Sequence, residues 1–119
     1  MHELPIVRQI LSGVLSAAEQ AGAVRVDRVV LEIGEMHDLI PEWVDKFFRY
    51  ASRGTIAEKA ELVIERPPLI CRCAKCGEHF VLHPRASAVW ACSNCGSRDF
   101  AMLGGEEFSI REIAYVSNE

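Results

Sequence analysis

The sequence predicts an α+β protein in which two helices pack on one face of a three-stranded sheet. Apolar residues recur every three or four positions in two segments and alternate with polar residues in three others. The helical segments run over 4–21 and from Pro41 to Gly54, and the strands run over 25–34, 60–66 and 107–116. Before the last strand lie two Cys-x-x-Cys-Gly segments, in which 15 residues separate Cys76 from Cys92. That spacing is typical of a zinc site, so we expect an inserted zinc-ribbon lobe.

The first helix is predicted from one apolar stripe that ends before Gly22, a common residue at helix ends. The stripe consists of Leu4, Val7, Leu11, Val14, Leu15 and Ala18. The second helix begins at Pro41, because the N–H that proline lacks has no partner in a first turn. Its buried face is expected to comprise Val44, Phe47, Phe48 and Ala51, with Trp43 and Tyr50 beside it.

The strands and breaks between them define two domains. Pro67-Pro68 cannot donate to a central ladder and predicts a hinge into the lobe, and Gly104-Gly105 predicts the return. Short strands within 78–91 are expected to bring the two cysteine pairs together. The predicted domains are an α/β domain, residues 1–66 and 104–119, and a zinc-binding ribbon domain, residues 67–103.

Composition limits the function classes. The chain has 119 residues and a formal net charge of −4, which argues against a nucleic-acid binder because such proteins usually carry a basic surface. It contains no apolar run of the roughly 20 residues that span a membrane. No secretory signal is visible, so a cytoplasmic location is expected, and paired cysteines in a reducing compartment are typical of metal ligands.

The four cysteines Cys73, Cys76, Cys92 and Cys95 can surround one ion tetrahedrally, as in a closed structural zinc site. Four thiolates also bind iron, so a small electron carrier is an alternative that the spacing does not exclude. A closed site has no open position for a substrate, and the sequence contains no catalytic motif, so we expect a protein that is not an enzyme. The fifth cysteine, Cys71, is either a bystander on the strand that enters the first pair or an alternative ligand.

Histidines provide further candidate ligands. His37, His79 and His83 are each either exposed loop residues or metal ligands. At the N-terminus, the α-amine of Met1, the His2 imidazole and the backbone amide nitrogens can chelate one ion in fused rings, in the square-planar, nitrogen-rich geometry that suits Ni(II) and Cu(II). The alternative is that His2 is an exposed residue at a frayed end.

Taken together, these motifs resemble the HypA/HybF family of hydrogenase nickel-incorporation proteins. The matching segments are Met1-His2-Glu3-Leu4, Leu31-Glu32-Ile33-Gly34-Glu35, Pro41-Glu42, the run from Gly54 to Leu62, and both cysteine pairs. The resemblance implies a metallochaperone that delivers Ni(II) for [NiFe]-hydrogenase maturation, and in some bacteria also for urease. It implies nickel ligands at Met1, His2 and Glu3, and structural zinc at the four cysteines. The implied partners are a HypB-type GTPase and the hydrogenase large-subunit precursor.

The main alternative is a zinc-ribbon adaptor that binds a protein or a nucleic acid through its ribbon face. The sequence leaves open whether the chain is a monomer or a homodimer, although the two hinges would permit exchange of lobes between protomers.

Overall fold

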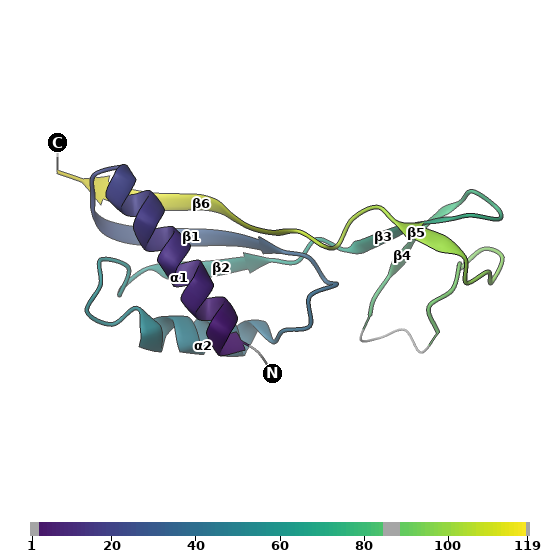
Figure 1. The fold of residues 1–119 in the computed structure, drawn as a ribbon, viewed down its shortest axis with the longest axis horizontal. Coiled ribbons are helices and arrows are strands. Elements are labelled where there is room, and N and C mark those ends of the chain that lie inside the picture. Colours follow the sequence, from purple (N-terminus) through teal and green to yellow (C-terminus); the bar gives the residue numbers. More distant parts are fainter. Residues whose placement is uncertain (1–2, 85–88, 119) are drawn as a thin grey trace. The chain divides into compact units, whose positions relative to one another are not determined.

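The computed structural model describes residues 3–84 and 89–118, which form two compact units. The helical unit comprises Met1–Leu31, Asp38–Ile64 and Ser109–Glu119, and the ribbon unit comprises Glu32–His37 and Glu65–Phe108. Each unit contributes one three-stranded sheet (Figure 1). The expected architecture, two helices on a three-stranded sheet with an inserted ribbon lobe, is therefore confirmed.

The first sheet has the strand order β2-β1-β6. Its strands are β1 (Ala23–Ile33), β2 (Glu61–Glu65) and β6 (Phe108–Ser117). The chain direction follows from hydrogen bonds at the strand ends: Arg66, just after β2, donates to the carbonyl of Ile33 at the end of β1, so these two strands run the same way. Gly34, just after β1, donates its N–H to Glu107, just before β6, so β6 runs the opposite way.

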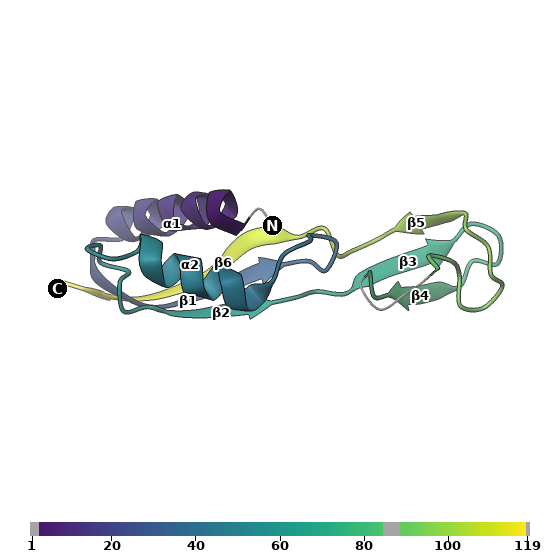
Figure 2. The ribbon, with the colours of Figure 1, turned by 90° about the horizontal axis from the view of Figure 1, so that it is seen from below.

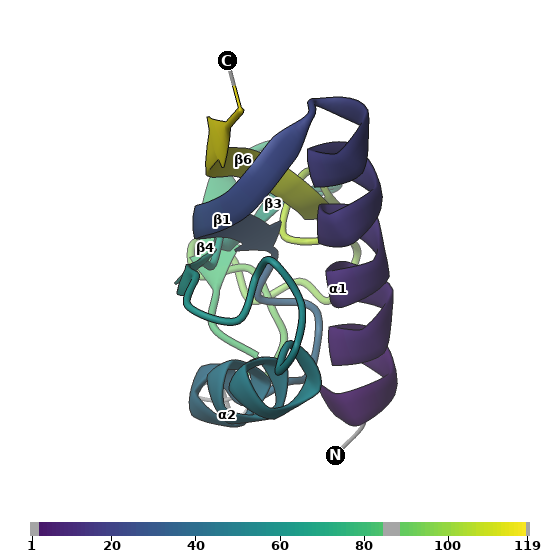
Figure 3. The same ribbon diagram turned by 90° about the vertical axis from the view of Figure 1, so that its left-hand side faces the viewer.

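Helices α1 (Glu3–Gln20) and α2 (Pro41–Ala51) lie on the same side of this sheet (Figure 2). The N-terminal end of α1 lies beside α2, as the end-on view also shows (Figure 3). Further along α1, Gly13 comes so close to β6 that a Cβ added there would lie 3.0 Å from Cδ1 of Ile110. The small residue therefore lets the helix approach the sheet closely.

The helices bury much of the face that the sequence predicts, with some shifts. Val7, Val14 and Ala18 of the predicted α1 stripe are buried together with Ile10, whereas Leu4 is exposed. In α2 the buried residues are Val44 and Phe48, and Phe47 is half-buried. The centre of the core is β1, whose buried side chains are Val26, Val29, Val30, Leu31 and Ile33.

The ribbon sheet has the order β4-β3-β5, with both outer strands antiparallel to β3. Its strands are β3 (Leu69–Cys73), β4 (His79–Leu82) and β5 (Phe100–Met102). The prediction of a strand near Val89–Ala91 is wrong. The described residues there form bends and irregular backbone, and the third strand of the ribbon sheet lies at Phe100–Met102 instead. One face of the sheet is buried by a small cluster of Leu69, Cys71, Cys73, Phe80, Leu82 and Cys92. Phe100 packs on this cluster with its ring edge-to-face on Phe80, at 5.4 Å between centroids.

A joint inside the ribbon unit connects residues 32–37 to the segments that enter and leave the ribbon. The Arg66 guanidinium donates to the carbonyls of Ile33 at 2.7 Å, Gly34 at 3.0 Å and His37 at 2.7 Å. The backbone of Gly34 also passes directly against Gly105, where an added Cβ would lie 2.0 Å from the Gly105 oxygen. Only glycine fits that approach, which accounts for Gly34 at the end of β1.

Candidate metal sites

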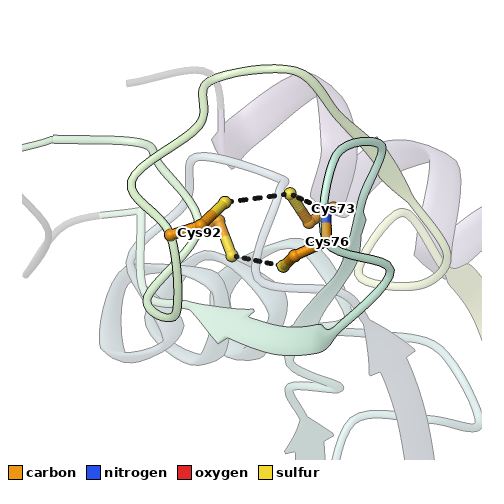
Figure 4. A group of neighbouring side chains, drawn as sticks. Cys73, Cys76 and Cys92 are labelled. Carbon is orange, nitrogen blue, oxygen red and sulfur yellow. Dashed lines mark hydrogen bonds between the residues drawn. The ribbon is translucent and has the colours of Figure 1, made fainter.

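The four predicted cysteines come together in the ribbon unit. Their sulfur atoms all lie within 4.8 Å of one another, and two distances are 3.5 Å (Cys73 to Cys95) and 3.6 Å (Cys76 to Cys92) (Figure 4). A tetrahedral zinc ion with Zn–S bonds of about 2.3 Å places its sulfurs about 3.8 Å apart. The donor set and its spacing therefore fit one tetrahedral ion, and all four positions around that ion would be filled by protein.

Both cysteine pairs adopt the same turn. The N–H of Gly77 donates to the Cys73 carbonyl at 3.0 Å, and the N–H of Gly96 donates to the Cys92 carbonyl at 2.8 Å. Both glycines have positive φ, 76° and 77°, which an L side chain adopts only with strain. The Cys-x-x-Cys-Gly pattern of the sequence thus places a glycine where each turn requires one.

Backbone N–H groups of the two turns point at the sulfurs. Cys76 donates to Sγ of Cys73 at 3.5 Å, and Asn94 donates to Sγ of Cys92 at 3.3 Å. Such donors stabilise a thiolate. The N–H of Cys76 is the main reason why the pKa of Cys73 falls to about 6. For Cys95, the N–H of Ser97 lowers the pKa, but the neighbouring sulfurs, Cys73 first, outweigh it and raise the pKa to about 11.

The two shifts differ in cause: a backbone N–H dominates the fall in pKa at Cys73, whereas at Cys95 the neighbouring sulfurs outweigh the Ser97 N–H. Like charges this close to one another disfavour further ionisation, so four thiolates cannot coexist here without a cation. A divalent ion would remove that repulsion and hold all four cysteines deprotonated.

Cys71 lies outside this cluster. It is fully buried in the middle of β3, and burial raises the pKa of its thiol. It pairs with Phe80 on one side and Met102 on the other. Cys71 is therefore a core residue on the strand that leads to the first cysteine pair.

At the N-terminus, the predicted ligands Met1 and His2 lie outside the described residues, and Glu3 is the first residue of α1. The Glu3 side chain is buried, and its Oε2 accepts the N–H of Ile40 at 3.1 Å. Burial acts to raise the pKa of this carboxyl, but hydrogen bonds from the N–H groups of Glu3 and Ile40 outweigh it and lower the pKa. The carboxylate thus ties the start of α1 to the residue before α2. The sequence predicted a role only for the Glu3 amide, since nothing local marks a contact between residues 37 positions apart.

The other histidines lie apart from the cysteine cluster. His37 has its Nε2 2.9 Å from the Glu106 carbonyl oxygen and packs edge-on against Phe108. His83 lies 3.6 Å from the Glu35 carboxylate, measured from Nδ1. His79 is exposed in β4. Among the residues that the structure describes, the four cysteines form the only group of three or more histidine, cysteine or acidic side chains close enough to share an ion.

These features define a class of protein: a small α/β unit joined to a ribbon unit with a four-cysteine metal site. The profile described as "Hydrogenase/urease nickel incorporation, metallochaperone, hypA" matches residues 1–115. The chain belongs to the HypA family.

Related proteins support this assignment along nearly the whole chain. The chain is 40% identical over 114 residues to the hydrogenase maturation factor HypA of Chlorobium limicola, covering 95% of each protein. It is 35% identical over 113 residues to that of Chlorobium luteolum, covering 95% of this chain and 94% of the relative. The solution structure of the Ni metallochaperone HypA from Helicobacter pylori has the same fold, with a TM-score of 0.66 at 21% identity over 99% of this chain and 100% of that one.

Membership places the chain among nickel-incorporation metallochaperones of hydrogenase maturation, which are maturation factors and not enzymes. Within the described ranges, no helix is long and apolar enough to cross a membrane.

Proposed function

We propose that this chain binds Ni(II) at its N-terminus and delivers it for [NiFe]-hydrogenase maturation, with urease as a second client. The nickel ligands in this proposal are the α-amine of Met1, the imidazole and amide of His2, and the amide of Glu3. Delivery would involve a HypB-type GTPase and the precursor of the hydrogenase large subunit, in the cytoplasm, where thiols stay reduced. The proposed nickel-binding domain is 1–66 with 104–119, and the zinc-binding domain is 67–103.

The observation that carries this proposal is the closed geometry of the cysteine site. Four sulfurs within 4.8 Å of one another leave no coordination position for a passing ligand. A cargo ion has to be exchangeable, so nickel needs a separate site in a chain of this family. Nitrogen donors in square-planar geometry suit Ni(II), and the N-terminal tripeptide supplies them within three consecutive residues.

The position of Glu3 supports the same proposal. The first four N–H groups of a helix have no acceptor within the helix, and Glu3 opens α1. Its amide can therefore lose a proton to a metal without breaking a helical hydrogen bond, and the bond given up is the one to its own carboxylate. The contact between the Glu3 carboxylate and Ile40 fixes the start of α1 at Glu3.

For the cysteine site we propose zinc in a structural role. When bound, zinc would cross-link the two turns at Cys73, Cys76, Cys92 and Cys95 without redox chemistry. Iron would give visible absorption, whereas zinc is colourless, so the spectrum and elemental analysis of the purified protein distinguish the two.

The nickel site is tested by titrating Ni(II) into zinc-loaded protein with an authentic, untagged N-terminus, following the weak absorption bands of square-planar Ni(II). We expect one equivalent to bind. His2→Ala should abolish this binding, and so should acetylation of the Met1 α-amine, because it removes the amine donor while leaving the imidazole in place. His37→Ala is the matched control and should bind as the parent does. Equal binding by the parent and both N-terminal variants would move the site elsewhere.

A further inference from the structure

The ribbon sheet has one buried face, and its opposite face carries exposed aliphatic side chains. Side chains alternate between the two faces of a strand, so Ile70, next to the buried Cys71, points away from the buried cluster. Ile70 pairs with Val81 of β4, and on the other side of β3 the N–H of Leu103 donates to the Ile70 carbonyl at 2.7 Å. Leu103 follows Met102, the partner of Cys71, so it lies on the same face as Ile70. Ile70, Val81 and Leu103 are all exposed, and they form an aliphatic row across the sheet.

A basic row lies beside the aliphatic row on the same face. Arg72, two residues after Ile70, pairs with His79 of β4 and with Ala101 of β5. Arg72 and His79 are both exposed. Residues two apart on a strand are about 7 Å apart, so this is also the distance between the two rows. An apolar strip and a positive charge are therefore presented side by side on one flat surface.

The positive charge of Arg72 has no carboxylate partner among the residues that the structure describes. Three other arginines are paired with carboxylates at 2.6–3.5 Å, namely Arg25, Arg28 and Arg49. On the ribbon sheet, Asp99 lies two residues before Ala101 but forms no ion pair with Arg72. An arginine guanidinium is weakly hydrated and matches the geometry of a carboxylate, so an unpaired arginine beside an apolar strip favours an acidic ligand.

We propose that this face of the ribbon sheet binds a segment of another protein in which aliphatic side chains are flanked by carboxylates. The aliphatic side chains of the segment would cover Ile70, Val81 and Leu103, and a carboxylate about 7 Å away would bind Arg72. Three strands about 4.8 Å apart give a row about 10 Å long, which is the width of one helix or one extended segment. The contact is smaller than a standard protein interface, so binding is weak and reversible.

The chemistry of the surface favours this ligand over a nucleic acid or a membrane. Both are polyanions, and the net charge of −4 disfavours both. The basic row offers one guanidinium and one imidazole, which is too few cations to follow a phosphate backbone, and the aliphatic row has no counterpart on such a backbone. Exposed apolar patches with polar groups beside them are typical of protein interaction sites. This inference does not depend on where nickel binds.

The test is an NMR titration of the full, zinc-loaded chain with a short capped peptide that carries two leucines flanked by glutamates. We expect the amide signals of Ile70, Arg72 and Val81 to shift progressively, with a dissociation constant of about 1 mM or below. Arg72→Glu should weaken binding at least about tenfold, because it replaces an attraction by a repulsion. A second peptide with lysines in place of the glutamates should show the opposite preference and bind Arg72→Glu more tightly than the parent.

Matched variants separate this surface from a general effect of charge or hydrophobicity. Val81→Thr keeps a β-branched side chain of similar size but removes apolar surface, so it should weaken binding severalfold. Val24→Thr makes the same change in the helical unit at a residue that is equally exposed, 49% against 48%, and should bind the peptide as the parent does. Arg8→Glu, which reverses an exposed charge on α1, is the control for Arg72→Glu. An unchanged zinc content and amide spectrum will show that each variant is folded.

Three results would overturn the proposal. The first is the absence of shifts on β3 and β4 at several millimolar of the glutamate peptide. The second is equal binding of the glutamate and lysine peptides by the parent, because Arg72 would then play no part. The third is a different ligand on the same face, seen either as co-sedimentation with phosphatidylglycerol vesicles that Arg72→Glu abolishes or as shifts of Ile70 and Val81 that follow protein concentration alone. Vesicle binding would assign the face to a membrane, and concentration-dependent shifts would assign it to a second copy of the chain.

Discussion

Replacing Cys95 by alanine is expected to damage the ribbon unit more than replacing Cys71, although burial alone predicts the reverse order. Cys71 is fully buried in β3, whereas Cys95 is exposed. If packing decided the outcome, Cys71→Ala would be the more harmful change. If metal ligation decides it, Cys95→Ala is the more harmful one.

The two magnitudes can be worked from the structure. Cys71→Ala removes one buried sulfur and leaves a small cavity, which costs about 1–2 kcal/mol. Cys95→Ala loses almost no packing, but it removes one of four ligands. Structural zinc contributes about 10–16 kcal/mol in small metal-folded units, so an equal share per ligand is about 2.5–4 kcal/mol. The small cluster around Phe80 has little surplus to offset such a loss.

Both variants should be purified with zinc and compared by elemental analysis, thermal unfolding and amide NMR spectra. We expect Cys71→Ala to keep one zinc per chain, with a modestly lower unfolding temperature. Cys95→Ala should lose zinc, and the amide signals of β3 and β4 should collapse while those of α1 and β1 remain dispersed. Retention of one zinc by Cys95→Ala, with unfolding no earlier than for Cys71→Ala, would refute a stabilising four-ligand site.

Two further predictions concern the backbone around these sites. Glu3→Gln should lower the unfolding temperature at neutral pH, because it weakens the hydrogen bond from the Ile40 N–H. Folding lowers the pKa of Glu3, so its carboxylate stabilises the protein above the unfolded pKa, and this stabilisation is lost as the pH falls through the folded pKa. The unfolding temperatures of parent and variant should therefore converge at acid pH. Gly34→Ala should destabilise by at least about 3 kcal/mol in urea unfolding, since the new Cβ would collide with the Gly105 backbone. Gly22→Ala is the matched control. Because Gly22 has a φ of 73° and open space around it, this substitution should lower the free energy of unfolding by only about 1–2 kcal/mol. Equal losses of stability in the two variants would mean that the contact at Gly34 relaxes freely.

Most of the helical unit could be predicted from the sequence because its signals are local. The apolar stripe and Gly22 placed α1 within one residue at each end, and Pro41 marked the first residue of α2. The cysteine cluster was equally predictable, since two short turns with fixed spacing carry all four ligands. In both cases the deciding interactions lie within a few residues of one another.

The third ribbon strand shows where local signals fail. Val89-Trp90-Ala91 has suitable residues for a strand, yet Phe100–Met102 pairs with β3 instead. Which segment pairs with β3 depends on which one can reach it once the second cysteine turn is in place. Phe100 follows that turn closely in the sequence and pairs with Cys73. Strand propensity reflects how well a residue fits a pleated, half-buried surface. In the ribbon unit, that surface exists only after the two cysteine pairs have come together.

The two proposed metal sites also differ in what an exchange of ligands would require. Releasing a cysteine from the four-sulfur cluster means opening a turn whose carbonyls and N–H groups are bonded within 3.0 Å, so ligand loss and local unfolding are one event. The proposed nickel ligands lie in three consecutive residues, and the described one, Glu3, is held by its side chain while its amide has no helical acceptor. An acceptor could therefore replace the nickel ligands one at a time without breaking a helix or a sheet. Rapid transfer of one ion and permanent retention of another are thus compatible in a single short chain.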